Sequence, residues 1–589
     1  MKKSRIILGL ISTAVLFALS GCSNKSETTS DGETLVLSYW IPRAEDESYY
    51  SSYNDNPIVQ YIQKNYTFDG KTIKMDYYVA PTGGEQDNFN NLLATGEYCQ
   101  VIDMSMSSVT PAEMYEDGMI KDLTELIPQH MPNYMKFLEE NPDCEEAIYT
   151  IIDGEKKILA LTGFKDAADP NFQGFNYRRD WIAKYGVHPE TKAAFTYGFK
   201  DEADFESWED NVVFPSGTDE PIYISDWEWM FEIFDIAIAD LGITDGYGYS
   251  PYYQGFMPTG DLVCAFGGEA SGYWYRNEEN ECVFGPVTED FRAYLQCMQT
   301  WYTNGWMDAA FAEHTSDMFY AVDAAKVFSG KIGLWQGRQS TVGVQIDAGD
   351  GGYTEGAVVF GCRQPINDIY GNEGSQNKIP RTMFQATKLG STAVITDKVA
   401  DEDMVAILEY FDFLFSEEGL DVRTGLTKER YEETQDEFYT KWQLTDGLYA
   451  MQEVDGVDTV YYNIPVSNPL SIAAALGRGV NLTRVANVEE GFDVYLKQAV
   501  LAWDYYESVG NVVNTQAIIN AVSAEDNAVV SKVRTNVDQF MERVVSGMIM
   551  GKGYDVWDDA SWQQFCTDIG KYQPEKVTEV YQKAIDLLQ

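Results

Sequence analysis

The stretch Thr34-Leu-Val-Leu-Ser-Tyr-Trp-Ile41 decides the fold of this chain of 589 residues. Its short apolar run predicts a buried β-strand. A helical pattern at residues 57–65 comes next, and residues 72–79 alternate like a second strand. Residues 88–95 are helical in pattern and are followed by a third short strand at 101–104. Because strands and helices alternate here, we expect a parallel α/β sheet.

Three later segments have the apolar faces of helices. Residues 225–228, Ser-Asp-Trp-Glu, match a capping box, in which the serine caps the helix and the glutamate reaches back. The apolar face that follows extends to Leu241, and two further stripes run from 288 to about 305 and from 401 to 419. We expect all three to pack into a core, and the region from about residue 488 onward to be mostly helical.

The first 33 residues are typical of a secreted, lipid-anchored protein. Two lysines and an arginine precede an apolar stretch at residues 6–19, which is too short to span a bilayer as a stable anchor. Leu19-Ser-Gly-Cys22 then resembles a bacterial lipobox, which implies a signal peptide at 1–21 and a lipid anchor on Cys22. An ordinary secretory signal is the alternative. Residues 22–33 are predicted to be the lipidated cysteine and a flexible stalk, which places the protein at the extracellular face of the cytoplasmic membrane.

The charge of the chain limits its partners. Its formal net charge is −51, from 93 acidic and 42 basic residues. Nucleic acid is excluded as a partner, because its binding depends on lysines and arginines that neutralise phosphates. The same charge disfavours electrostatic binding to anionic lipid, so we expect membrane contact through Cys22 only. Neutral or cationic ligands are favoured by the long-range field.

Cysteine and histidine patterns give no sign of a metal centre. If Cys22 is lipidated, seven cysteines remain, an odd number spread widely along the chain, and no CxxC pair exists. This is not the framework of a disulfide-rich protein, although one disulfide is compatible with it. The three histidines are isolated from one another, without an HExxH motif. We therefore predict neither a metal nor a cofactor.

Several segments resemble, in the expected order, the extracellular solute-binding proteins of family 1, which are the lipoprotein components of carbohydrate ABC importers. The likeness covers nearly the whole mature chain, and the order of the segments carries it. After the lipobox, the stalk and the strand ending in Tyr39-Trp40, the segments are Ile152-Asp-Gly-Glu155, Asn176-Tyr-Arg-Arg-Asp-Trp-Ile-Ala-Lys-Tyr-Gly186, Phe284-Gly-Pro-Val-Thr288, Tyr302-Thr-Asn-Gly-Trp-Met-Asp308, Phe328-Ser-Gly-Lys-Ile-Gly-Leu334, Asp412-Phe-Leu-Phe-Ser-Glu-Glu-Gly419, and Gly547-Met-Ile-Met-Gly551 with Trp562 and Tyr581-Gln-Lys-Ala584.

This resemblance implies an α/β, two-lobed periplasmic-binding-protein-like fold of type II. Each lobe would be a mainly parallel sheet flanked by helices, with a hinge and a ligand cleft between the lobes. The first lobe is expected at 34–166 plus 362–430, and the second at 167–361 plus 431–589. The implied function is capture of an oligosaccharide and its delivery to ABC transporter permease subunits. The protein would be a monomer, not an enzyme, from a Gram-positive bacterium.

A sugar site needs aromatic platforms for the C–H faces of the sugar and polar groups for its hydroxyls. Most of the 13 tryptophans and 39 tyrosines must lie in the core or on ordinary surface, so the candidates are chosen by position, chiefly after strand ends. The alternative is core packing for Trp40 and a structural salt bridge for Arg178. By resemblance, Tyr252 and Trp335 match positions that face sugar in relatives. The predicted ligand-binding residues are Trp40, Asp103, Ser105, Asn176, Arg178, Tyr252, Trp274, Tyr275, Trp335, Arg338, Arg381 and Gln385.

Other functions remain open at this point. Some long relatives carry a calcium loop where this chain has residues 201–210, but these residues lack the alternating ligand spacing and the central glycine. A surface glycan-active enzyme would need a paired acid and base, which 93 acidic residues could supply, although no nucleophile elbow, zinc motif or P-loop is present. A peptide-binding importer component and a regulatory or adhesive lipoprotein are further alternatives.

Overall fold

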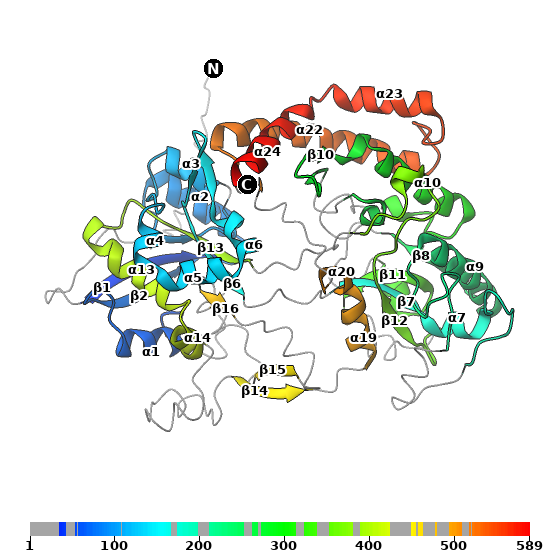
Figure 1. The fold of residues 1–589 in the computed structure, drawn as a ribbon, viewed down its shortest axis with the longest axis horizontal. Coiled ribbons are helices and arrows are strands. Elements are labelled where there is room, and N and C mark those ends of the chain that lie inside the picture. Colours follow the sequence, from blue (N-terminus) through cyan, green and yellow to red (C-terminus); the bar gives the residue numbers. More distant parts are fainter. Residues whose placement is uncertain are drawn as a thin grey trace, which may run out of the picture.

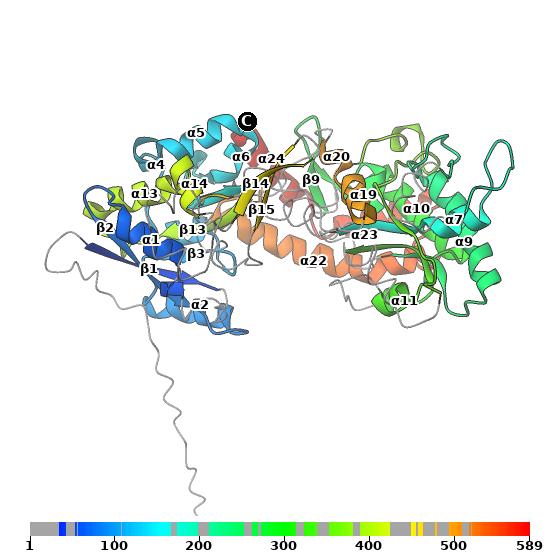
Figure 2. The same ribbon diagram turned by 90° about the horizontal axis from the view of Figure 1, so that it is seen from below.

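Two lobes, each built on its own β-sheet, make up the protein in a computed structural model (Figure 1). Three C-terminal helices lie along one side of both lobes (Figures 1 and 2): α22 (Ala524–Ile549), α23 (Asp559–Gly570) and α24 (Glu575–Leu588). The structure describes residues 34–42, 53–55, 57–107, 109–165, 173–197, 211–251, 262–268, 273–313, 323–338, 353–380, 389–423, 449–454, 457–462, 477–479, 494–508, 518–519 and 521–589.

The sheet of the first lobe has the strand order β16-β6-β13-β3-β1-β2. β1 pairs in parallel with β2 and β3, and β16 with β6, but β13 is antiparallel to both of its neighbours. β13 runs the other way because it enters the lobe at the edge toward which β1, β2, β3 and β6 run. The strands are β1 (Thr34–Ile41), β2 (Thr72–Val79), β3 (Val101–Asp103), β6 (Leu161–Lys165), β13 (Leu389–Ile395) and β16 (Arg478–Gly479).

Apolar side chains on both faces of β1 hold the helices of this lobe. Leu35, Leu37 and Tyr39 pack into one core cluster, whereas Trp40 packs into another beside α2. The helices are α1 (Pro57–Asn65), α2 (Glu85–Thr95), α3 (Pro111–Glu116), α4 (Leu126–His130), α5 (Pro132–Glu140), α6 (Pro142–Glu145), α13 (Met404–Phe413) and α14 (Glu417–Arg423), with the 3₁₀ helices η1 (Tyr53–Asp55), η2 (Glu146–Ile148) and η9 (Asp401–Asp403).

The sheet of the second lobe has the order β12-β7-β11-β8, and only its β8–β11 pair is parallel. Both sheets are therefore mixed, but in each of them all strands except one, β13 in the first lobe and β7 in the second, run in the same direction. The strands are β7 (Gln173–Arg178), β8 (Tyr247–Ser250), β11 (Ile332–Arg338) and β12 (Val359–Cys362). The helices are α7 (Arg179–Tyr185), α9 (Ile224–Leu241), α10 (Glu289–Asn304), α11 (Ala324–Phe328), α19 (Val494–Trp503) and α20 (Tyr505–Ser508), with η4 (Leu262–Phe266), η5 (Gly285–Val287), η6 (Phe311–Glu313) and η8 (Glu373–Ser375).

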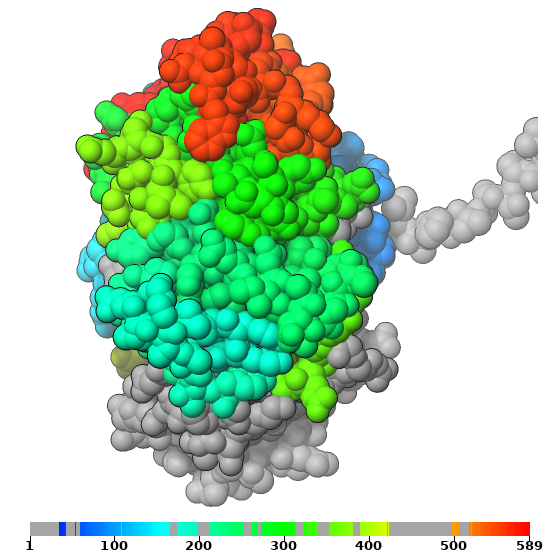
Figure 3. Space-filling model, turned by 90° about the vertical axis from the view of Figure 1, so that its right-hand side faces the viewer, coloured from blue at the N-terminus to red at the C-terminus, as the bar shows by residue number. Residues whose placement is uncertain are grey.

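The outer face of the second lobe is closed by helices (Figure 3). The segments of α7, α9 and α10 form one continuous surface there, with the C-terminal helices above them.

Three two-stranded sheets complete the described structure: β4 (Thr150–Ile152) with β5 (Glu155–Lys157), β9 (Trp274–Arg276) with β10 (Cys282–Phe284), and β14 (Tyr449–Val454) with β15 (Val457–Tyr462). Among the described helices, none combines the length and the apolarity that crossing a membrane requires.

Two of the predicted helices differ from the structure. α9 begins before Ser225, and Asp226 fixes its first turn by accepting hydrogen bonds from three backbone N–H groups at 2.9 to 3.0 Å. Ser225 instead donates to Asp368, and Glu228 accepts from an indole N–H, so the predicted capping box is absent. The helix predicted to end at Gly419 stops at Phe413 and a new one, α14, contains Gly419.

The lobe boundaries also differ from those expected. Residues after β12 stay on the second lobe, where Arg363 pairs with Glu220 and Lys378 with Asp290. The chain therefore returns to the first lobe between 380 and 389, about twenty residues later than expected. It returns there again at β16, which pairs with β6, although 431–589 was assigned to the second lobe. The first crossing, expected between 166 and 167, falls within the undescribed stretch 166–172.

Two glycines let α19 lie directly on the second sheet. A Cβ on Gly361 would come 2.4 Å from Ala499 Cα, and one on Gly174 would come 2.3 Å from the Trp503 ring. The Trp503 indole N–H donates to the carbonyl of Phe175 at 2.9 Å. A side chain at either glycine would force the helix away from the strands.

We predict that Gly361→Ala destabilises the protein by about 1 to 3 kcal/mol, because the new methyl group overlaps the backbone of α19. Urea unfolding measures the free energy of unfolding. Gly570→Ala, at a helical glycine whose Cβ would meet nothing within 4 Å, is the matched control and should be neutral or stabilising. Equal stability of both variants would contradict the packing of α19 described above.

Candidate functional site

The chain connections turn one edge of each sheet toward the other lobe. β1 and β3 run in the same direction as β2 and end at the edge where β6 also ends, and residues 166–172 lead from β6 to β7. β13 begins at that edge after the second crossing, with Leu389 opposite Phe164. On the second lobe the matching edge contains the start of β7 and the ends of β8, β11 and β12. Ligand sites of α/β sheets lie at such carboxyl ends.

On the first lobe, Asp103 and Ser105 lie together at this edge. Asp103 is buried, and its carboxylate accepts hydrogen bonds from the backbone N–H of Ser105 at 2.8 Å and from the Ser105 hydroxyl. The carboxylate therefore shapes the loop after β3 and leaves Ser105 and Met106 exposed. Contact of Ser105 with a ligand stays a prediction that this position supports.

On the second lobe, Arg178 forms the structural salt bridge that was the alternative to ligand binding. Its guanidinium donates two hydrogen bonds to Asp180, at 2.8 and 2.7 Å, and one each to the carbonyls of Gly330 and Tyr353 at 3.1 Å. The side chain is only 2 % exposed, so it has no donor directed to solvent. Asn176 is fully buried in β7; its amide N–H donates to Gly174, and its carbonyl oxygen has no partner among the described residues.

Four predicted aromatic platforms lie inside the lobes. Trp40 is 1 % exposed, packs against Phe89 and donates to Asn88 at 2.9 Å. Trp335 packs beneath α19 in the same cluster as Trp503. Trp274 and Tyr275 are buried in β9, where the Trp274 indole donates to the carbonyl of Pro574 at 3.3 Å. Their role in ligand binding stays a prediction, and no exposed ring supports it.

The remaining predicted residues give no test of the site. Arg338 ends β11 and pairs through its backbone with Gln173, but its side chain is not described. The lipid anchor Cys22, the candidate calcium loop 201–210 and the candidates Tyr252, Arg381 and Gln385 lie outside the described residues. In the part of the chain that the structure describes, no cluster of three or more potential metal ligands occurs.

Sequence reasoning missed a group of side chains on the gap-facing side of the second lobe. α19 covers the face of the second sheet that is turned toward the first lobe, and α20 follows it in the chain (Figure 1). Ala499 and Trp503 face the sheet, whereas Leu501 and Tyr505 are 65 % and 38 % exposed. The signal was in the spacing. Four residues separate the two members of each pair, which places them on one helix face, and the two pairs are offset by two residues, which places the pairs on opposite faces.

Arg363 lies against Tyr505 in this group. The centre of its guanidinium is 3.8 Å from the Tyr505 ring centroid, and the guanidinium donates two hydrogen bonds to Glu220. Burial lowers the pKa of Arg363, but Glu220 and the two neighbouring tyrosines raise it, so the net shift is upward and the guanidinium stays charged. Tyr506, the next residue of α20, donates to the carbonyl of Gln364 at 2.7 Å.

The two lobes also meet at the C-terminal helices, along a contact that we call the seam. Glu146 of η2 pairs with Arg276 of β9 at 2.9 Å, and Lys156 of β5 donates to the Leu588 carbonyl of α24 at 3.0 Å. Ile151 of β4 belongs to the core cluster of the second lobe. The seam is therefore a packed and charged junction that any change in the relative position of the lobes must alter.

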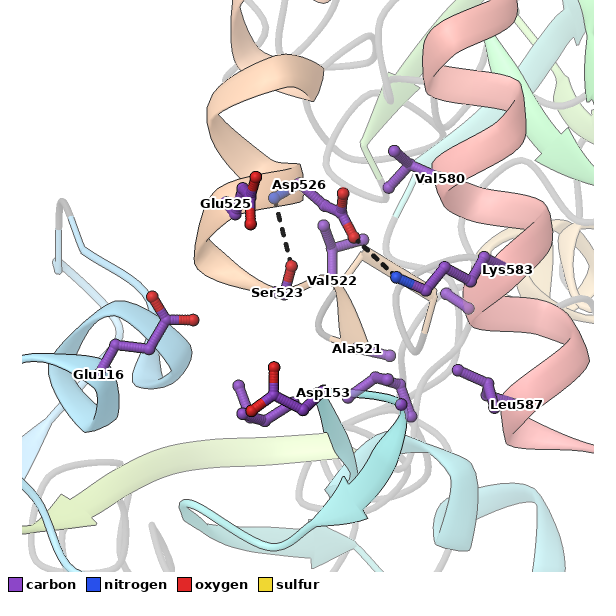
Figure 4. Close-up of a pocket in the computed structure, with 14 residues that line it drawn as sticks. Glu116, Asp153, Ala521, Val522, Ser523, Glu525, Asp526, Val580, Lys583 and Leu587 are labelled. Atoms are coloured by element: carbon purple, nitrogen blue, oxygen red, sulfur yellow. Dashed lines mark hydrogen bonds and ion pairs between the residues drawn. The ribbon is translucent and has the colours of Figure 1, made fainter.

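A pocket of about 390 Å³ opens on the seam (Figure 4). Glu116 of α3 and the Asp153-Gly154 turn line it from the first lobe, and both turn residues have the positive φ angles of a tight hairpin, 54° and 84°. Asp526 of α22 pairs with Lys583 of α24 at 3.3 Å on the other side (Figure 4). Because both lobes line it, the shape of the pocket depends on their relative position.

The fold is shared with solved solute-binding proteins. An extracellular solute-binding protein from Bifidobacterium longum subsp. infantis is 13% identical (95% of this chain, 99% of that chain, TM-score 0.60). An HMO-binding, ABC-transporter-associated solute-binding protein from Bifidobacterium longum infantis is 14% identical (95% and 99%, TM-score 0.57). A Streptococcus pneumoniae FusA EF-hand mutant in complex with fructo-nystose, an ABC-transporter substrate-binding protein, is 14% identical (94% and 99%, TM-score 0.53).

These likenesses define the class of fold. The chain has the two-lobed fold of ABC-transporter solute-binding proteins over nearly its whole length, as the resemblance in sequence implied. No family model and no curated protein sequence matches it.

We predict that Arg276→Met weakens the seam and lowers the free energy of unfolding by about 1 kcal/mol, because it removes a partly buried ion pair. The control is Lys136→Met, which removes the exposed pair of Lys136 with Glu140 and should cost close to nothing. Urea unfolding of both variants measures the difference. A cost for Lys136→Met as large as that for Arg276→Met would argue against a structural role of the seam pair.

Proposed function

We propose that this protein captures an oligosaccharide between its two lobes outside the cytoplasmic membrane and delivers it to the permease of an ABC importer. One observation carries this proposal: the polar carboxyl ends of both sheets are turned toward the junction across which the chain connects the lobes. The shared fold supports it, because the solved proteins with this fold include one in complex with fructo-nystose and one that binds HMO.

The proposed mechanism follows from two bodies joined by short connections. The ligand first binds to one lobe, and rotation of the other lobe then encloses it. The ligand shifts this equilibrium only by its higher affinity for the closed form. The closed complex is the form that docks on the permease, and no bond of the ligand is broken at any step.

The location of the protein belongs to the same proposal. A lipid anchor on Cys22 would hold the lobes near the permease, with residues 23–33 as a flexible stalk. The charge of −51 keeps the rest of the chain away from anionic lipid, so the anchor would be its sole membrane contact. A monomer from a Gram-positive bacterium is part of this proposal.

A thermal-shift screen tests the proposal. We expect that the purified protein, with residues 1–22 omitted, melts at a higher temperature with one family of oligosaccharides, because the ligand binds only the folded state. At a ligand concentration of one hundred times Kd the stabilisation is about 2.7 kcal/mol. Chromatography of the mixture should show the oligosaccharide intact.

Two results would contradict the proposal. Release of a cleaved sugar would identify an enzyme instead of an import protein. A rise in melting temperature with short peptides, and with none of the sugars, would identify a peptide-binding importer component.

A further inference from the structure

Leu501 and Tyr505 give the second lobe an apolar stripe on the side that faces the first lobe. They lie four residues apart, and the Asp504 backbone N–H donates to the Val500 carbonyl at 2.9 Å, so a helical turn connects them. Trp503 is held on the sheet by its hydrogen bond to Phe175, which fixes the opposite stripe outward. The exposure of Leu501 and Tyr505 is thus a consequence of how α19 packs.

Tyr505 is held in place on one side. The Arg363 guanidinium covers one face of the ring at 3.8 Å, and Glu220 fixes the guanidinium through two hydrogen bonds. The Tyr506 ring also packs nearly perpendicular to the Tyr505 ring, with 5.3 Å between the ring centroids, and 38 % of Tyr505 is still exposed. A flat aromatic surface that is already ordered loses little entropy when a ligand stacks on it.

The charges beside Tyr505 are the Arg363–Glu220 pair and the half-buried carboxylate of Asp504, so their balance is negative. Arg363 and Glu220 form a neutral pair, so the guanidinium is not free to bind a carboxylate of a ligand. Glu220 is more exposed than Arg363, 39 % against 14 %, and its oxygens can accept hydrogen bonds from sugar hydroxyls. The field of a chain with net charge −51 adds repulsion for any anionic sugar.

We propose that Tyr505 is an aromatic platform of the second lobe, and that the sugar stacked on it is a neutral oligosaccharide and not a uronate. This inference rests on the proposed function and adds the platform residue and the class of sugar, neither of which the shared fold decides. Arg363 positions the ring, and Glu220 both neutralises Arg363 and accepts from the ligand.

Calorimetric titration of the purified protein with three probes tests this inference. The probes are a fructo-oligosaccharide, a neutral milk oligosaccharide and an oligouronate of similar length. We expect binding of at least one neutral probe and none of the oligouronate. Tyr505→Ala should weaken binding of the neutral probe by at least about tenfold, whereas Tyr505→Phe keeps the ring and should bind within about twofold of the wild type.

Matched variants separate this role from loss of folding. Tyr197 is another exposed tyrosine, at 45 %, in the segment after α7, and Tyr197→Ala should leave the affinity unchanged. Glu220→Gln removes the charge that neutralises Arg363, so measurable binding of the oligouronate should appear. The melting temperatures of all variants without ligand show that each is folded.

The outcomes distinguish this inference from the proposed function. If the wild type binds a neutral probe and Tyr505→Ala binds it equally well, Tyr505 is not the platform, while sugar capture stands. If the wild type binds the oligouronate more tightly than the neutral probes, the class of sugar is wrong. If no sugar of any kind binds, the proposed function fails, and this inference fails with it.

Discussion

The close packing of α19 on the second sheet is the constraint on which the gap-facing side of that lobe depends. Gly174 and Gly361 leave room for Trp503 and for the backbone at Ala499, so the helix lies against β7 and β12 without intervening side chains. The hydrogen bond from Trp503 to Phe175 then fixes the rotation of the helix about its axis. Once that rotation is set, the stripe of Leu501 and Tyr505 faces away from the sheet.

The two lobes are coupled in two physically different ways. The chain itself joins the sheets, because residues 166–172 connect the end of β6 to the start of β7. The seam at the C-terminal helices is instead packed, with an ion pair between Glu146 and Arg276 and an apolar contact through Ile151. A ligand that draws the lobes together must therefore work against the contacts of the seam as well as against its own desolvation.

Local patterns predicted many elements well. The strands at 34–41 and 72–79 and the helix at 57–65 have the predicted bounds, because their apolar residues follow one period without interruption. The helix from Thr288 is capped by that residue, whose side chain accepts from Phe291, and it ends at Gly305 with a left-handed φ of 77°. The capping box at 225–228 failed because both of its side chains have tertiary partners: Ser225 donates to Asp368, and Glu228 accepts from the Trp301 indole.

The candidate site was harder to predict, since burial depends on partners distant in the chain. Trp40, Trp274 and Trp335 are of a residue type that can stack on sugars, but all three are covered. α2 covers Trp40, the C-terminal segment covers Trp274, and α19 covers Trp335. Tyr505, by contrast, is exposed only because Trp503 two residues earlier is held on β7. The apolar periods of the sequence determined the α/β class, and the resemblance of its ordered motifs implied the two lobes; both signals are local properties. Only the tertiary structure decided the direction of β13, the lobe boundaries and the exposed aromatic surface, because these depend on contacts between segments hundreds of residues apart.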